Sequence, residues 1–180
     1  MALQRFTIDG YGQIEPNNVT FTRDGRVEAQ CALGSDDMIA ENGMLLAVDV
    51  ANRVVKFPTE SETLPIAIHY STEKIYNQFT PGLKNFKLEK KDGYYPRMGY
   101  LTVGEVFTTN CLCYDTTDFT DDETLKTALA AAGTTPVYGG ISTLGAIKLQ
   151  KAKPTVGPVL KVAKATTMPD GQYAVEFQVQ

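Results

Sequence analysis

The sequence contains no tryptophan, one histidine and three cysteines among its 180 residues. A lone histidine, His69, cannot supply the histidine-rich ligand sets of common zinc sites, and three cysteines leave an odd thiol in any disulfide framework. No run approaches the roughly 20 apolar residues of a membrane-spanning helix. The first residues also lack the apolar core of a secretory signal. We therefore expect a chain that is made in a cytoplasm and has no membrane partner.

The sequence also lacks a strong excess of either charge, since its net charge is −4. Residues 1–80 carry 6 basic and 11 acidic side chains, whereas residues 81–180 carry 11 basic and 10 acidic ones. Nucleic-acid-binding proteins usually show a dominant basic excess, so we expect no nucleic-acid partner. A lysine-rich segment without acids begins at Lys148 and ends at Lys164. Such a segment is typical of a solvated face or of a surface that complements an acidic subunit.

Motifs that carry chemistry are missing as well. The sequence has no phosphate-binding glycine loop and no nucleophile elbow. Cys111 and Cys113 would point to the same side of a strand, but with Cys31 they offer three thiolates where a tetrahedral metal site normally needs four ligands. We interpret the cysteines as small buried side chains and His69 as a strand residue. The sequence therefore predicts no catalytic residue, no metal ion and no cofactor.

What the sequence does contain is a series of alternating apolar runs broken by turn residues. These runs predict hairpins over residues 19–30, 45–58 and 157–180, with turns at Asp24-Gly25, Ala51-Asn52 and Pro169-Asp170-Gly171. A buried strand is expected over residues 64–71, and Asp92-Gly93 marks a further turn. Residues 99–103 and 106–114 read as two strands that meet at Gly104-Glu105. The second of these has bulky apolar residues in both alternation classes, which indicates burial on both faces.

Helical signals are few. Residues 120–132 predict one short helix, in which Thr120 caps the first turn and Glu123 completes a capping box. Leu125 and Leu129 would share its buried face, and Gly133 is a suitable stop. Residues 35–43 predict at most a single helical turn.

These elements predict a mainly β fold, an antiparallel β-sandwich or a barrel-like domain built from hairpins. Residues 1–18 are polar and broken by glycine, and we expect them to form an extended N-terminal arm. Residues 19–180 would form a single β-rich domain with a long loop excursion near 136–158. A two-lobe arrangement that splits near Pro58 is the alternative.

Three stretches carry a resemblance to a known family: "AENGMLLAVDVANRVVKFP", "PGLKNFKLEKKDGYYPRMGYLTVGEVFTTNCLCYD" and "PDGQYAVEFQV". They resemble capsid decoration proteins, also called cement or auxiliary head proteins, of tailed bacteriophages. The resemblance implies a virion protein on the outside of a DNA-filled head. It also implies two partners: the major capsid protein, whose neighbouring subunits it would clamp, and further copies of itself in a homotrimer.

If the resemblance holds, the arm and the lysine-rich segment are the expected contact surfaces. The expected capsid or subunit contacts are Arg5, Phe6, Ile8, Tyr11, Lys148, Lys151 and Lys153. The three lysines would face an acidic partner. Two other functions stay open at this point: a tail, neck or fibre component of a virion, and a receptor- or carbohydrate-binding β module.

Overall fold

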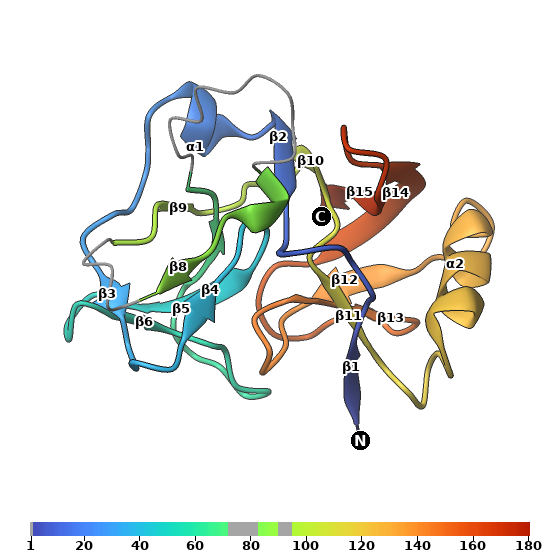
Figure 1. Cartoon of the computed structure of the whole chain (residues 1–180), viewed down its shortest axis with the longest axis horizontal. Helices are drawn as coiled ribbons and strands as arrows, with labels where there is room; N and C mark the ends of the chain where they lie inside the picture. Colours follow the sequence, from blue (N-terminus) through green and yellow to red (C-terminus); the bar gives the residue numbers. More distant parts are fainter. Residues whose placement is uncertain (1, 72–82, 90–94) are drawn as a thin grey trace.

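Residues 2–71, 83–89 and 95–180 are described in a computed structural model of the chain (Figure 1). The fold is mainly β, as the sequence predicts. The expected turn at Asp92-Gly93 lies outside the described residues. Among the described residues, no helix is long and apolar enough to cross a membrane, including α1 and α2 in Figure 1.

The larger sheet has eight strands in the order β1-β11-β13-β12-β14-β15-β10-β2. Their bounds are β1 Leu3–Arg5, β2 Ile14–Asn18, β10 Val106–Thr109, β11 Leu112–Asp115, β12 Tyr138–Gly140, β13 Ile147–Gln150, β14 Leu160–Thr167 and β15 Tyr173–Val179. All neighbouring pairs are antiparallel except β11 and β13, which are parallel. The predicted C-terminal hairpin is confirmed as β14 and β15, with Gly171 at a φ of +86° in its turn.

This sheet curls back toward itself. Only Asn110 and Cys111 separate β10 from β11, although four strands lie between these two in the sheet. Three Cα steps span at most about 11 Å, whereas strands five places apart in a flat sheet would be about 24 Å apart. The short link therefore requires a barrel-like curl, in agreement with the barrel-like alternative that the sequence predicts.

Polar side chains fix this link against the segment that precedes β2. The backbone N–H of Gln13, which precedes β2, donates to the Asn110 Oδ1 atom at 2.7 Å. The Thr109 hydroxyl donates to the Gln13 carbonyl at 2.6 Å and accepts the Cys111 N–H at 3.0 Å. These bonds satisfy backbone groups that the interrupted ladder would leave without partners.

The smaller sheet has five strands in the order β3-β6-β5-β7-β9, and a two-stranded ladder joins β4 to β8. Their bounds are β3 Ala32–Leu33, β4 Ile39–Ala40, β5 Leu45–Asp49, β6 Val54–Lys56, β7 Ile66–His69, β8 Leu88–Glu89 and β9 Met98–Gly99. The predicted hairpin over 45–58 is confirmed as β5 and β6, and the strand expected over 64–71 is β7. Strands from both sides of Pro58 share this sheet, so a division of the chain into two lobes near Pro58 is wrong.

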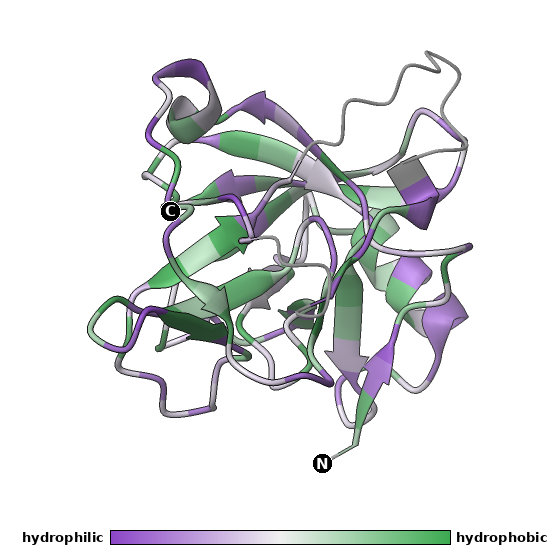
Figure 2. Cartoon of the chain, turned by 60° about the vertical axis from the view of Figure 1, so that its left-hand side comes forward, coloured by the Kyte–Doolittle hydropathy of each residue, from purple (hydrophilic) through white to green (hydrophobic). Residues whose placement is uncertain are grey.

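Buried apolar side chains form two clusters. The large-sheet cluster contains Phe6, Ile14, Val19, Phe21, Leu45, Ile68, Phe107, Leu112, Tyr114, Phe119, Leu125, Leu129, Ala132, Val137, Ile147, Leu149, Leu160, Val162, Val175, Phe177 and Val179. The small-sheet cluster contains Cys31, Leu33, Met38, Ala40, Met44, Leu46, Val48, Val55, Ala67, Leu88, Met98, Cys111, Cys113 and Ala146. In Figure 2 the hydrophobic residues lie mainly along the central strands, and hydrophilic residues dominate the outer turns.

Strand β11 lies between these two clusters. Leu112 and Tyr114 belong to the large-sheet cluster, whereas Cys113 belongs to the small-sheet cluster. All four residues of β11 are buried. The expected burial on both faces is therefore confirmed for this part of the 106–114 run, although the run itself is two strands and not one.

Helix α2, Asp122–Ala130, confirms the predicted helix with one change at its start. Asp121, and not Thr120, is the N-cap, and its Oδ1 atom accepts the Thr124 N–H at 2.7 Å. Leu125 and Leu129 are buried, and the helix packs on β14. Residues 35–43 form turns and β4 without a helix.

The hairpin expected over 19–30 is wrong. Residues Thr20–Arg23 form the short helix α1 instead. The buried Glu105 side chain explains the change, because it accepts hydrogen bonds from both the backbone N–H and the hydroxyl of Thr20. Phe21 is buried against Gly99, where a Cβ atom would lie only 1.9 Å from the ring. Tertiary contacts thus override the local alternation.

Two expected extensions are also strands. Residues 136–158 contain β12 and β13, which lie inside the larger sheet, so the expectation of one long loop there is wrong. Residues 2–18 contain β1 and β2, which form the two edges of the same sheet. Because Phe6 and Ile14 are buried in the large-sheet cluster, this segment is part of the domain core and not a separate arm.

Candidate functional site

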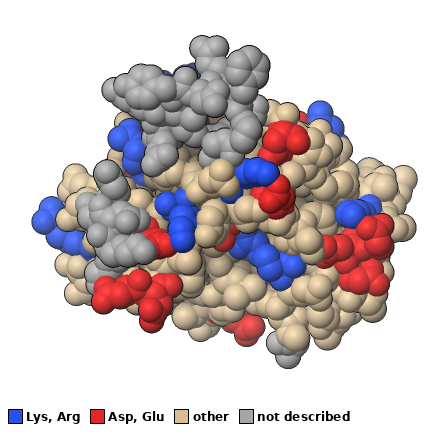
Figure 3. Space-filling model, in the orientation of Figure 1, with Lys and Arg blue, Asp and Glu red and all other residues tan. Residues whose placement is uncertain are grey.

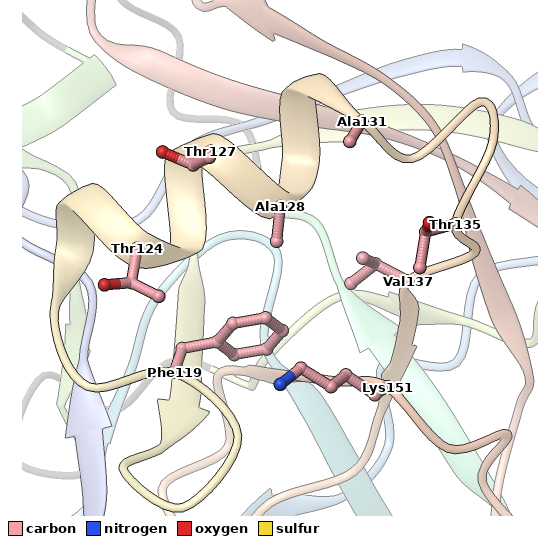
Figure 4. A pocket seen from close by; sticks show the side chains of 8 residues that line it. All are labelled: Phe119, Thr124, Thr127, Ala128, Ala131, Thr135, Val137 and Lys151. Carbon is pink, nitrogen blue, oxygen red and sulfur yellow. The ribbon is translucent and has the colours of Figure 1, made fainter.

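A groove of about 450 Å³ lies between α2 and the larger sheet (Figure 4). Its lining residues are Phe119, Thr124, Thr127, Ala128, Ala131, Thr135, Val137 and Lys151. We call it the α2 groove. Phe119 is 1% exposed and forms part of its floor. In Figure 4, Ala128 approaches the Phe119 ring from one side and Lys151 from the other.

The helical wall of the α2 groove is apolar in spite of its threonines. The Thr127 hydroxyl donates to the Glu123 carbonyl at 2.9 Å, inside the same helix. The Thr124 hydroxyl bonds to the Thr120 hydroxyl at 3.0 Å. With both hydroxyls engaged by their own chain, the remaining helical lining consists of methyl groups from Thr, Ala128 and Ala131.

Lys151 supplies positive charge to this apolar surface. Its ammonium lies 5.4 Å from the centroid of the Phe119 ring, within the range of a cation–π contact. The side chain is exposed, and it makes no ion pair with any residue of the described ranges. Lys151 therefore keeps its charge available to an acidic group outside the chain.

The other two lysines of the expected contact set differ from Lys151. Lys148 is half-buried, and its Nζ atom lies 3.6 Å from the Asp115 Oδ2 atom. Lys148 also lines a second hollow, of about 230 Å³, together with Glu60 and Pro154. Lys153 is exposed and lies outside the linings of both of these hollows. The structure thus places the three lysines in different surroundings and singles out Lys151.

The N-terminal contact residues are used largely inside the fold. Arg5 forms an ion pair with Glu41, in which the Nη2 and Oε2 atoms lie 2.6 Å apart. The Phe6 side chain is 2% exposed. Ile8 is half-buried against the large-sheet cluster, and Tyr11 is half-buried with the Lys87 ammonium 5.3 Å from its ring centroid. Because Phe6 is buried, it cannot contact another subunit while the domain is folded.

His69 forms a closed polar network at the end of β7. Its Nδ1 atom lies 2.8 Å from the Glu41 carbonyl, which can only accept, so Nδ1 carries the proton. Its Nε2 atom then accepts from the Ser71 hydroxyl at 2.8 Å, and that hydroxyl accepts the Arg97 N–H at 3.1 Å. Burial lowers the pKa of His69 to about 4. The ring is therefore neutral at pH 7 and joins three segments of the chain.

The three cysteines are buried and unpaired with one another. Burial raises the pKa of Cys111 to about 12 and that of Cys113 to about 11, so both are thiols at neutral pH. Cys111 is enclosed by glycines: a Cβ atom on Gly12 would lie 2.9 Å from its sulfur, and one on Gly43 would lie 3.0 Å from its Cβ atom. The interpretation of the cysteines as small buried side chains is confirmed.

Ionisable side chains do not gather elsewhere into a metal site in the described part of the chain. No group of three or more His, Cys, Asp or Glu residues there is placed to hold a metal ion. On the face shown in Figure 3, acidic and basic side chains are interspersed, and acidic ones gather at the right, where Figure 1 places α2. Asp122 and Glu123 lie in the first turn of this helix.

Sequence reasoning missed the apolar part of the α2 groove. It singled out Lys151 but not Phe119, Ala128 or Val137. The sequence did contain a pattern that points to this groove. Residues 124, 128 and 131 recur at helical spacing on one face of the helix, and all three are small, whereas a fully packed face would carry large side chains. Their position over Phe119 depends on the packing of α2 on the sheet, which local sequence does not specify.

The chain matches no protein-family model, no curated protein and no solved structure.

Proposed function

We propose that this protein is a structural virion protein that binds the outside of a phage head and stabilises the capsid lattice. Its partners would be the major capsid protein and further copies of itself. The observation that carries the proposal is the resemblance of three stretches of the sequence to capsid decoration proteins. In the described residues these stretches form β5 and β6, β8 to β11, and the whole of β15.

The structure offers a physical basis for such a role. Two buried apolar clusters give the domain a packed core, and the exposed side chains of Lys151 and Lys153 would offer positive charge to an acidic partner. A protein that binds only the expanded lattice stabilises that lattice by mass action. Placement at many symmetric positions multiplies a modest interface through avidity.

Purified heads with and without the protein provide the test. Heads that carry it should resist heat or osmotic shock better than heads that lack it, and adding purified protein should restore the resistance. Lys151→Glu and Lys153→Glu should lower its occupancy on heads, because both would meet an acidic partner with the wrong charge. Equal resistance of both kinds of head, or location of the protein on tails instead, would contradict the proposal.

A deletion of the N-terminal residues is not a suitable test. It would remove β1 and the buried Phe6, and with them part of the domain core. Substitutions at the exposed Lys151 and Lys153 should leave the fold intact, and they test the contact with the capsid directly.

A further inference from the structure

We propose that the α2 groove is a docking site for an extended segment of a partner protein that carries an apolar side chain and, close to it, a carboxylate. This inference does not depend on the virion role. It follows from the size of the groove, from the methyl groups that line it and from the charge of Lys151.

The length of the helical wall limits the occupant. From Thr124 to Ala131 the helix advances seven residues, or about 10 Å. An extended chain advances about 3.3 Å per residue, so about three residues of a partner would lie along this wall. A volume of about 450 Å³ is sufficient for one or two side chains of such a segment.

The lining specifies the chemistry of those side chains. Phe119, Ala128 and Val137 offer apolar surface, which favours an aliphatic or aromatic side chain. The ammonium of Lys151 lies beside this surface, without an ion pair among the described residues. A carboxylate one or two residues from the apolar side chain would reach it. A nucleic acid is disfavoured, because binding a phosphate backbone takes several cations along its path and the groove lining holds one.

The form of the groove favours a protein segment over an enclosed small molecule. Its floor is buried at Phe119, whereas Thr124, Thr127 and Ala131 on the helical wall are exposed. A ligand would therefore lie along the surface with one side open to water. An extended peptide meets this condition, because its backbone groups can remain solvated on the open side.

The test uses the intact protein and three short peptides that differ at one residue, which is negative, neutral or positive. The probes are acetyl-Leu-Thr-Glu-amide and the same peptide with Gln or Lys in place of Glu, titrated by methyl NMR. We expect the Ala128, Ala131 and Val137 methyl signals to shift. The Glu peptide should bind about threefold more tightly than the Gln peptide, as a partly exposed ion pair allows. The Lys peptide should bind most weakly.

Matched variants separate the groove from the general surface. Lys151→Gln should abolish the preference for Glu over Gln, whereas Lys153→Gln, at a lysine outside the groove, should preserve it. Ala131→Arg should block all three peptides by filling the groove. Ala130→Arg, on the next residue of the same helix and outside the lining, should leave binding unchanged.

Three results would overturn the proposal. The first is no shift of the groove methyls up to about 10 mM peptide, a concentration at which even millimolar dissociation constants are visible. The second is equal affinity for the three peptides. The third is a shift of the same methyls when the protein is concentrated alone, because a second copy of the chain would then be the occupant. None of these results would bear on the resistance of phage heads.

Discussion

The large-sheet and small-sheet clusters are built from different kinds of side chain. The large-sheet cluster holds six buried aromatic rings, including Phe107 and Phe177, whose centroids lie 5.6 Å apart. The small-sheet cluster has no buried aromatic residue among its described members. It contains instead all three cysteines and three methionines, Met38, Met44 and Met98.

This difference has a physical consequence. Aromatic rings bury large areas and fix their neighbours through specific ring geometry. Methionine is unbranched and adapts to irregular space, and cysteine acts as a small hydrophobe. We therefore expect the large-sheet cluster to set most of the stability of the domain, and the small-sheet cluster to tolerate changes of shape.

The strongest test removes a ring from the large-sheet cluster. Phe177→Ala should lower the free energy of unfolding by about 3–5 kcal/mol, because it leaves a cavity and removes the partner of Phe107. Urea denaturation measures the change. Val103→Ala, at a side chain that is 74% exposed, serves as a control and should stay within about 0.5 kcal/mol of the parent protein. A loss below about 1.5 kcal/mol at Phe177 would contradict this account of the cluster.

The second test uses pH to disturb the His69 network beside the small-sheet cluster. The pKa of His69 falls from 6.5 to about 4 on folding, so the unfolded chain binds the proton more readily. The network's contribution is complete above pH 6.5 and should be lost as the pH falls to 4, by roughly 3 kcal/mol in total. Urea denaturation at several pH values measures this loss.

A control for the pH experiment is His69→Gln, whose unfolding free energy should change little between pH 6.5 and 4.5. Acidic groups with lowered pKa, such as Asp115 and Asp170, lose their contributions only at lower pH, since their ordinary value is already 3.8. If the unfolding free energy of the variant falls with pH as steeply as that of the parent protein, a group other than His69 titrates between pH 6.5 and 4.5.

The sequence predicted strands wherever alternation and a short turn coincide. The hairpins β5–β6 and β14–β15 follow from local pattern alone, and so does the buried face of α2. The hairpin predicted over residues 19–30 is wrong because Glu105, 85 residues from Thr20 along the chain, accepts hydrogen bonds from Thr20 and stabilises a helical turn there. The loop predicted over residues 136–158 is wrong, because that prediction rested on their glycine, proline and lysine content. Gly139 and Gly140 lie in the sheet, where Gly139 packs closely against Phe177.

The same limit applies to the candidate site. Lysine clustering identified Lys151, but the sequence could not show that Lys148 pairs with Asp115 while Lys151 does not pair within the described residues. Nor could it place Phe119 beneath α2. Both facts depend on contacts between segments far apart in sequence.

The third test measures how well the small-sheet cluster excludes solvent. All three thiols are buried, and the raised pKa values of Cys111 and Cys113 keep them protonated. Labelling of the folded protein with a thiol reagent at pH 8 should be at least about a hundredfold slower than in urea, because reaction requires local opening. Rapid labelling of both residues would mean that β11 is not buried on both faces.

The smallest effect is expected from Met98→Leu in the small-sheet cluster. Leucine has a similar volume, and volume-conserving changes in a core usually cost less than about 1.5 kcal/mol. The cluster that contains Met98 also holds other sulfur-containing side chains, whose adaptability should absorb the change of shape. Its matched counterpart is Phe107→Leu, which also introduces leucine but removes an aromatic ring from the large-sheet cluster. Urea denaturation should show a clearly larger loss of unfolding free energy for Phe107→Leu. If Met98→Leu costs as much as Phe107→Leu, the two clusters do not differ in plasticity, and the contrast between aromatic and sulfur-rich packing does not govern stability here.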